Sequence, residues 1–286
     1  MKINSLIKKE AARQKRVINL IPSENYVSKD VLAALSSPLT NKYAEGYSHK
    51  RYYFGNKVID EVEDEVKNLV YRAFKISSKE WDVNVQPYSG SIANLAVYLG
   101  ILELGDRILA MSLEHGGHLS HGHLVSLTGK LFKFRHYGVG HDGFIDYEEV
   151  ARIAKKFKPT LIVCGASAYP RKIDFGKFRK IANSIGALLM ADIAHIAGLI
   201  VGGVHSSPFP YADIVTTTTQ KTLRGPRGAI IIAKKGLMDR IDKAVFPGLQ
   251  GGPHMHTIAA IGVCLEEAVR PGFKKYAKQT VANALA

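Results

Sequence analysis

Five short apolar runs recur through the middle of the chain, and their alternation with amphipathic segments restricts the fold more than any other feature. The runs are rich in branched residues, as buried strands are, and lie at Arg107–Met111, Thr160–Cys164, Ala187–Met190, Ile214–Thr218 and Ala229–Ala233. Between them, Tyr147–Lys156 and Phe175–Ile185 have helical patterns. The first of these helices places acids first and lysines last, in keeping with the helix dipole. We therefore predict an α/β fold in which a mostly parallel sheet is flanked by helices.

Three more helices are predicted outside this alternation, at Val58–Phe74, His256–Val269 and Phe273–Ala286. No glycine or proline stop signal follows the last of them. The pattern alone leaves two explanations open, a natural C-terminal helix or a chain that is part of a longer gene product.

Composition excludes several classes of protein. Of the 286 residues, 46% are hydrophobic and 22% are charged, as in an ordinary globular protein, and no apolar run has the length of a membrane span or a signal-peptide core. Cys164 and Cys264 lie in apolar stretches, so we expect reduced thiols and a cytoplasmic location. The formal charge of +14 attracts anions. Because no basic stripe is interleaved with aromatic residues, we expect a solvated basic surface and no nucleic-acid or membrane partner.

One lysine stands where covalent chemistry is expected. Lys221 follows the β-branched run Thr216–Thr219 and precedes the turn Leu223–Gly228. A lysine at a strand end can form a Schiff base when burial or nearby cations lower the pKa of its ammonium. We expect Arg224 and Arg227 to supply these cations.

An acid lies at the end of another predicted strand. Asp192 follows the run Ala187–Met190, and open α/β sheets bind ligands at the carboxyl ends of their strands. An ionised acid there would keep a pyridine nitrogen protonated, and together with a Schiff-base lysine it is the pattern of a pyridoxal phosphate enzyme. The alternative is a cap for the segment that follows. His195, close by, could orient the acid or the cofactor.

Two glycine-containing segments are further candidates. Small and hydroxyl residues at Ser89–Ser91 would let backbone N–H groups at a helix start approach a phosphate, although an ordinary N-cap has the same sequence. Four histidines fall within Glu114–His123. Metal binding must be considered there, but no cysteine or HExxH spacing supports it, so we predict no metal and favour a histidine ring stacked on a flat cofactor.

These motifs together resemble those of the serine hydroxymethyltransferase family. The similarity runs from Leu20–Asn25 to Asn283–Ala284, and its longest blocks are Leu39–Tyr47, Gly116–Gly122, the segments of Asp192 and Lys221, and Pro247–Pro253. The resemblance implies a fold-type I, aspartate-aminotransferase-like large domain that binds pyridoxal 5′-phosphate. It also implies transfer of a one-carbon unit between serine and glycine, with tetrahydrofolate as acceptor, in a homodimer or tetramer whose active sites are shared between subunits.

The resemblance assigns cofactor roles to the motifs above. Lys221 would carry the cofactor, Asp192 would pair with its pyridine nitrogen and Arg227 would tune Lys221. His118 would stack on the ring. Contacts to the ring oxygen would come from Ser167 and His195, and contacts to the phosphate from Ser89, Gly90 and Ser91, with Tyr43, Gly251 and Gly252 reaching it across the dimer.

Substrate roles are implied in the same way. Glu45 would be the acid/base group near the hydroxymethyl group and folate, with Tyr53 beside it. Ser23 would help to bind the substrate carboxylate. The residues expected to line the folate site are Leu113, Gly117 and Leu119.

The chain departs from the family pattern at three places. Gln220 replaces the usual histidine before the lysine, and Phe54-Gly55 replaces the usual glycine pair. The family's C-terminal domain, with its carboxylate-binding arginine, has no counterpart, which favours truncation. We expect an N-terminal arm (1–40), a cofactor-binding large domain (41–250), and an interface loop with the start of a helix leading to the missing domain (251–286). A cofactor-binding remnant with little activity, an α-methylserine hydroxymethyltransferase and a threonine-type aldolase remain alternatives.

Overall fold

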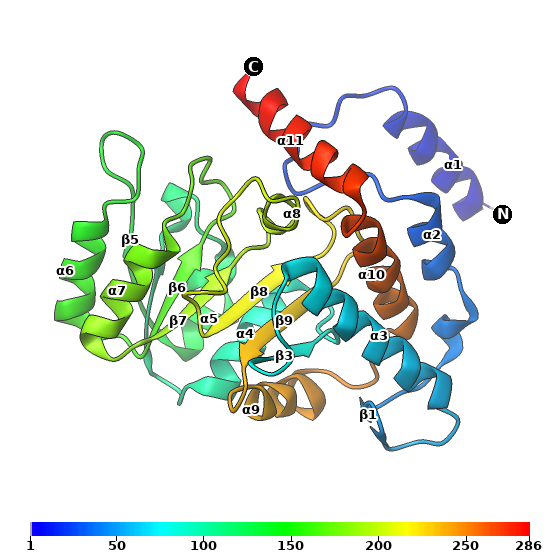
Figure 1. Ribbon diagram of the computed structural model, residues 1–286, viewed down its shortest axis with the longest axis horizontal. Coiled ribbons are helices and arrows are strands. Elements are labelled where there is room, and N and C mark those ends of the chain that lie inside the picture. Colours follow the sequence, from blue (N-terminus) through cyan, green and yellow to red (C-terminus); the bar gives the residue numbers. More distant parts are fainter. Residues whose placement is uncertain (1) are drawn as a thin grey trace.

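The computed structural model describes residues 2–286, and its centre is a seven-stranded sheet with the strand order β3-β9-β8-β7-β6-β4-β5 (Figure 1). The seven strands are β3 (Trp81–Asn84), β4 (Arg107–Met111), β5 (Lys133–Tyr137), β6 (Leu161–Gly165), β7 (Leu188–Asp192), β8 (Ile214–Thr218) and β9 (Ala229–Lys234). Four of the six pairings, those joining β5, β4, β6, β7 and β8, are parallel. The prediction of a mostly parallel α/β sheet is confirmed.

The five strands predicted from the sequence are all present, with small shifts at their ends. Two more strands complete the sheet and were missed, β3 and β5. β3 pairs antiparallel with β9, and β9 pairs antiparallel with β8. In β5 most side chains are exposed, because it is an edge strand, so it lacks the apolar run by which a buried strand is recognised.

Most of the helices flank the sheet, on both of its sides (Figure 1). Their bounds are α1 (Lys2–Gln14), α2 (Lys29–Leu35), α3 (Lys57–Phe74), α4 (Gly90–Ile101), α5 (Leu127–Leu131), α6 (Tyr147–Phe157), α7 (Phe175–Ile185), α8 (Ala197–Val201), α9 (Met238–Lys243), α10 (Met255–Ala268) and α11 (Pro271–Leu285). The five predicted helices match α3, α6, α7, α10 and α11 to within two residues. Asp146 and Asp174 accept hydrogen bonds from the first backbone N–H groups of α6 and α7, which explains why these helices begin where they do.

Side chains that alternate along the strands form two separate cores. Leu109, Ile162 and Leu189 face α3, α6, α7 and α10, whereas Ile108, Leu161 and Met190 face α4 and α9. This alternation follows from the two-residue repeat of a strand. Because both faces are covered, polar groups at the strand ends are the ones that reach a ligand.

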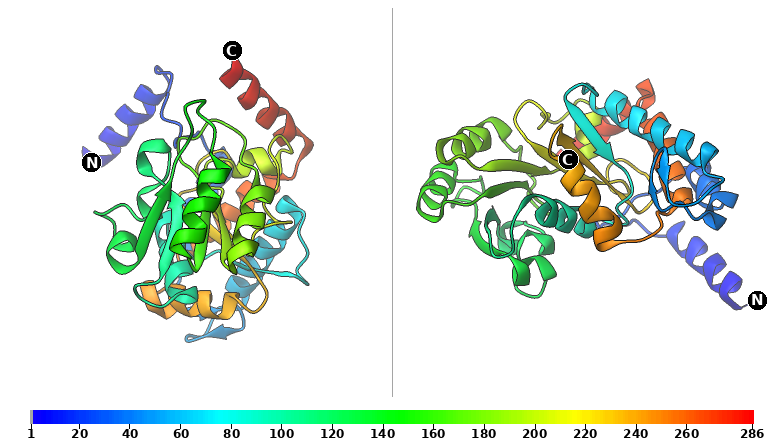
Figure 2. Two further views of the ribbon diagram at one scale, coloured as in Figure 1. Left: turned by 90° about the vertical axis from the view of Figure 1, so that its left-hand side faces the viewer. Right: turned by 90° about the horizontal axis from the view of Figure 1, so that it is seen from below.

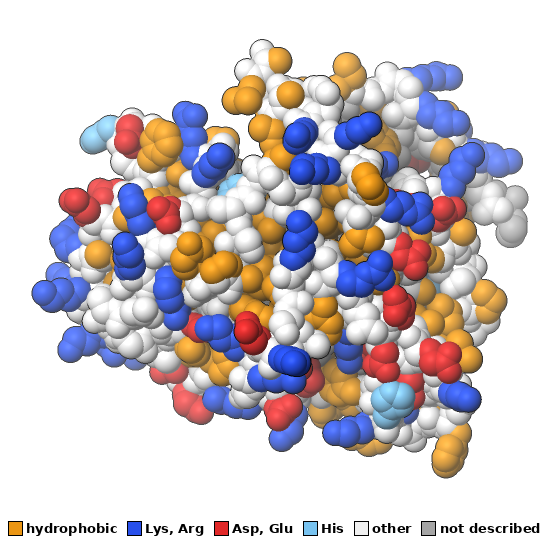
Figure 3. Space-filling model, viewed as in Figure 1, with side chains coloured by type: hydrophobic (Ala, Val, Ile, Leu, Met, Phe, Trp, Pro, Cys, Tyr) orange, Lys and Arg blue, Asp and Glu red, His pale blue; other side chains and the backbone are white. Residues whose placement is uncertain are grey.

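The N-terminal helix stands apart from this body (Figure 2). None of the residues of α1 is buried, and Ile3 and Ile7 are largely exposed. No helix among residues 2–286 is long and apolar enough to cross a bilayer. Lysine and arginine side chains are spread over the face seen in Figure 3, with acidic side chains between them.

A short hairpin lies beside the sheet. Its strands β1 (Gly46–Tyr47) and β2 (Lys50–Arg51) pair antiparallel, with Gly46 opposite Arg51. The hairpin follows directly on Tyr43 and Glu45, two of the predicted site residues, and so fixes where they lie.

Candidate active site

A cavity of about 380 Å³ opens at the carboxyl ends of β6, β7 and β8, next to the start of α4. Open α/β sheets bind their ligands at this edge. The predicted site residues that line the cavity are Ser23, Ser89, Gly90, Ser91, Leu113, Gly117, His118, Leu119, Ser167, Asp192, His195, Lys221 and Arg227. Segments spread over two hundred residues of sequence therefore meet at one place.

Lys221 reaches the cavity from a tight loop after β8. Its side chain is only 8% exposed. Burial lowers the pKa of the Lys221 ammonium, and Arg227 lowers it further, although Asp192 acts in the opposite direction. A lower pKa leaves more of the amine neutral and able to attack a carbonyl carbon.

The loop that carries Lys221 is fixed on both sides. Asn25 donates to the backbone oxygen of Lys221 (2.9 Å), and the hydroxyl of Thr222 bridges the backbone oxygen of His195 (2.9 Å) and the backbone N–H of Gly198 (3.0 Å). A Cβ on Gly198 would lie 2.1 Å from the backbone oxygen of Thr222. Only glycine allows α8 to approach this closely, so the position of Lys221 depends on it.

Arg224 does not contribute the charge that we expected of it. Its backbone φ of 64° is left-handed, which turns the side chain toward the ring of Tyr276, 5.0 Å from the guanidinium carbon. The Arg224 Nε donates to the Tyr26 backbone oxygen (3.3 Å). Of the two arginines, therefore, only Arg227 lowers the pKa of Lys221.

Asp192 is buried at the end of β7 and is held by three donors. Its Oδ2 accepts from Asn94 (2.8 Å) and lies 3.0 Å from His121 Nε2, and its Oδ1 accepts from the Ala194 backbone N–H (3.1 Å). Burial alone would raise the pKa of Asp192, but the hydrogen bonds from His121 and Asn94 hold it well below its usual value. The carboxylate is thus ionised at neutral pH and lines the cavity.

Asn94 and His121 are functional candidates that the sequence analysis missed. Asn94 lies on α4, 98 residues from Asp192, and Thr216 and Ser120 fix its amide through bonds of 2.8 Å each. The sequence pattern places His121 only within the block Gly116–Gly122 and gives it no role of its own. Its spacing of three from His118 was a usable signal, because residues three apart in a 3₁₀ turn lie on the same side. His195, which we expected near the acid, makes none of these bonds.

His118 and His195 line the cavity as neutral rings. Burial lowers the pKa of both, and Lys221 adds to the effect, so that the pKa of His195 falls to about 4. His118 Nδ1 lies 2.8 Å from the Ser120 hydroxyl, which fixes the plane of the ring. A neutral, oriented imidazole is suited to stacking on a flat aromatic ring.

The start of α4 forms the anion-binding end of the cavity. Ser89 is the N-cap, and its hydroxyl makes no capping bond. The first N–H groups of a twelve-residue helix carry partial positive charge and lack intrahelical partners. Ser89, Gly90 and Ser91 thus offer hydroxyl and backbone donors to a phosphate.

Five predicted residues lie outside this cavity and form a second cluster. The rings of Tyr43 and Tyr53 meet edge to face at 5.8 Å. Gly252 lies beside the Tyr43 ring, and Gly251 beside the Glu45 carboxylate. This cluster, Tyr43, Glu45, Tyr53, Gly251 and Gly252, lies next to the Ser89 turn, since the Tyr88 hydroxyl donates to the Gly252 oxygen (2.6 Å). It nevertheless contributes nothing to the lining around Lys221.

No group of three or more histidine, cysteine, aspartate or glutamate side chains within residues 2–286 is arranged to hold a metal ion. Three of the four histidines of Glu114–His123 make other contacts. His118 and His121 belong to the Asp192 network, and His115 packs against Gly138.

The whole chain, residues 1–286, matches the family model described as serine hydroxymethyltransferase. The chain belongs to the serine hydroxymethyltransferase family. A protein of that name from Desulfotalea psychrophila is 57% identical over 282 residues, covering 99% of this chain and 65% of the relative. Another of that name, from Methanosarcina barkeri, is 60% identical over 280 residues, covering 97% of this chain and 67% of the relative. The chain thus spans about two thirds of the length of these curated relatives.

The serine hydroxymethyltransferase family has the pyridoxal-phosphate-dependent fold type I. The mostly parallel, helix-flanked sheet of this chain agrees with that fold. The resemblance read from the sequence is confirmed at the level of family and fold.

Proposed function

We propose that this chain interconverts serine and glycine with pyridoxal 5′-phosphate as cofactor and tetrahydrofolate as the one-carbon acceptor. The observation that carries the proposal is that a buried lysine of lowered pKa and an ionised aspartate line the same cavity. Both relatives described above bear the name serine hydroxymethyltransferase. The α-methylserine and threonine-type alternatives have no comparable support.

The residues of the cavity fit pyridoxal phosphate. Lys221 would hold the aldehyde carbon, Asp192 the ring nitrogen, and the Ser89–Ser91 turn the phosphate. His118 would stack on the ring, with Ser167 and His195 on its oxygen side. When bound, the cofactor supplies an electron sink for bonds at the amino-acid α-carbon.

The residues of the chain would then orient the substrate and move protons. Ser23 and Arg227 line the cavity. Ser23 would help to receive the amino-acid carboxylate, and Arg227 would tune Lys221. Leu113, Gly117 and Leu119 also line the cavity and would pack against folate. Asp192, kept ionised by Asn94 and His121, would hold a proton on the ring nitrogen.

The proposal is tested by assaying glycine formation from serine. Purified chain is saturated with pyridoxal phosphate and given serine, with and without tetrahydrofolate. We expect glycine to form at a rate that depends on both the cofactor and tetrahydrofolate. Cofactor binding without any glycine would instead identify the chain as a cofactor-binding remnant. Faster cleavage of allo-threonine than of serine, with no dependence on folate, would identify an aldolase.

We further propose that the active site is shared between two copies of the chain in a homodimer. Support comes from the cluster of Tyr43, Glu45, Tyr53, Gly251 and Gly252, which lies outside the cavity around Lys221. Tyr53 of this cluster and its neighbours Tyr52 and Phe54 are exposed, Phe54 completely, and large apolar patches of this kind occur at protein interfaces. A second copy would bring Glu45, as acid/base group, and Tyr53 to the cavity of the first, with Tyr43 and the two glycines on its phosphate.

A complementation experiment tests the sharing of sites. Lys221→Met and Glu45→Gln chains are each expected to keep only a small, measurable residual turnover. After the two are mixed, dissociated and reassociated, half of the dimers contain one chain of each kind, and one of their two sites is intact. Activity should return to about a quarter of the wild-type value. If both residues act within one chain, the mixture will stay as inactive as its components.

We propose the division into an arm (1–40), a large domain (41–250) and an interface segment (251–286). We also propose a cytoplasmic location, because Cys164 and Cys264 are both buried free thiols, as suits a reducing compartment.

A further inference from the structure

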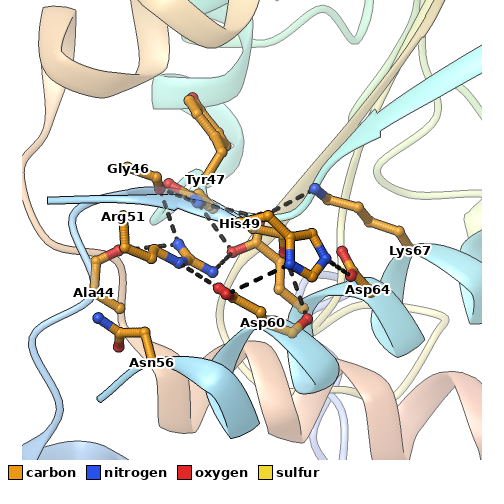
Figure 4. A network of polar contacts seen from close by, with 12 residues as sticks. Ala44, Gly46, Tyr47, His49, Arg51, Asn56, Asp60, Asp64 and Lys67 are labelled. Carbon is orange, nitrogen blue, oxygen red and sulfur yellow. Dashed lines mark hydrogen bonds and ion pairs between the residues drawn. The ribbon is translucent and has the colours of Figure 1, made fainter. Parts of the chain in front are cut away.

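Arg51 is the centre of a buried ionic cluster beside the β1–β2 hairpin (Figure 4). Its Nε donates to Asp60 (2.8 Å) and its Nη2 to Glu63 (2.7 Å). The three side chains are 3%, 12% and 0% exposed, respectively. Buried ion pairs are weak contributors to stability, since desolvation offsets much of their attraction. The cluster therefore calls for a role other than holding the fold together.

The remaining donors of Arg51 point at the backbone around Glu45. Its Nη1 donates to the oxygens of Ala44 (3.0 Å) and Gly46 (2.9 Å), the residues on either side of Glu45. In the hairpin ladder, the backbone N–H of Tyr52 donates to the oxygen of Glu45 itself (3.0 Å). Three consecutive carbonyl groups, 44 to 46, are thus all held in place.

Two neighbours restrict this arrangement further. Gln86 is buried and donates both to the Gly46 oxygen (3.0 Å) and to Glu63 (3.1 Å). Gly46 has a φ of 97°, and a Cβ there would lie 2.3 Å from the Lys50 oxygen. The backbone of Glu45 is therefore fixed by a rigid frame rather than by its own side chain.

We propose that Arg51 is a positioning residue for Glu45, with Asp60 and Glu63 orienting its guanidinium so that the fork holds the carbonyl groups flanking Glu45. The inference rests on the proposed function, in which Glu45 serves the cavity of a second copy. A group that acts across an interface needs a preset position, because a displacement of about 1 Å can cost on the order of 10²-fold in rate. The fork of five N–H donors on arginine spans two carboxylates and two carbonyls at once, and lysine cannot do this.

Three variants separate positioning from charge. Arg51→Lys keeps the charge and loses the fork, and Arg51→Met loses both. Lys67→Met is the matched control, because the Lys67 ammonium pairs with the same Glu63 (3.2 Å) but, within residues 2–286, is not bonded to the carbonyl groups of 44–46. We expect kcat for glycine formation to fall on the order of 10²-fold in both Arg51 variants, with KM for serine little changed and the absorbance of the bound cofactor unaltered. Lys67→Met should retain the wild-type kcat.

A double mutant tests whether Arg51 acts through Glu45. If it does, Arg51→Lys will lower kcat in the wild-type background but not in a Glu45→Gln background, because interacting residues are not additive. Equal losses in the two backgrounds would mean a general structural role and would overturn the proposal.

Hydrogen exchange supplies a readout that does not need activity. The Tyr52 amide, which bonds to the Glu45 oxygen, should exchange at least about tenfold faster in Arg51→Lys than in wild type or Lys67→Met, since local opening then costs less. Unchanged protection would overturn the proposal even if kcat falls. Faster exchange in a chain without serine turnover would uphold the positioning of Glu45 and refute only the proposed reaction.

Discussion

Replacement of Lys221 by methionine is expected to lower serine turnover on the order of 10²–10⁴-fold, the range typical of a positioned group that handles protons. Methionine fills a similar volume but has no amine, so it can neither bond to the cofactor aldehyde nor accept a proton. The chain should still bind pyridoxal phosphate through the Ser89–Ser91 turn and Asp192. The absorbance of the Schiff base, which requires the lysine to be bonded to the aldehyde, should be absent and be replaced by that of the free aldehyde.

The measurement is a cofactor titration followed by absorbance and by a glycine assay. Lys234→Met is the matched control, because Lys234 is a lysine next to Asp213 (3.3 Å) on β9, away from the cavity. It should keep both the absorbance and the turnover. If Lys221→Met retains the absorbance, another amine carries the cofactor, and the assignment of Lys221 is wrong.

The sequence predicts the strand-end residues of the site because their position depends on local pattern. Asp192 and Lys221 each follow a run of apolar or β-branched residues, and the carboxyl ends of parallel strands lie at one edge of a sheet. The Ser89–Ser91 turn could be placed for the same reason, since glycine and serine mark a helix start. All three positions converge on one cavity.

Contacts made only by tertiary packing could not be predicted in this way. Asn94 reaches Asp192 from the face of a helix 98 residues away, and no local pattern distinguishes it from other polar residues of α4. Arg224 was misjudged because its guanidinium packs on the ring of Tyr276, a tertiary contact that the local sequence does not reveal. The link from Arg51 to Glu45 was missed because it runs through the main-chain oxygens of Ala44 and Gly46, which carry no sequence signal.

Asp192→Asn is expected to lower turnover on the order of 10²–10³-fold, the loss typical when one preset electrostatic partner is removed. Asparagine has the same shape but cannot hold a proton on the ring nitrogen by charge, so the bound cofactor becomes a poorer electron sink. The carboxylate is already ionised in the folded chain, because His121 and Asn94 hold its pKa well below the usual value. The cofactor should still attach to Lys221, and the defect should appear in kcat.

The lowered pKa of Asp192 also predicts how the stability of the Asp192→Asn variant, relative to wild type, changes with pH. A carboxyl group whose pKa is lowered by folding contributes stability above its unfolded pKa of about 3.9 and loses it as the pH falls through the folded value. Urea unfolding should therefore show Asp192→Asn less stable than wild type at neutral pH, with the difference shrinking below about pH 4.

Asp213→Asn is the control, since Asp213 is also buried but pairs with Arg179 (2.9 Å), outside the cavity. Asp213→Asn should lose stability at neutral pH, because its ion pair with Arg179 is broken, while keeping the kcat of its folded fraction. A similar fall in kcat for both variants would mean that Asp192 supports the fold rather than the cofactor.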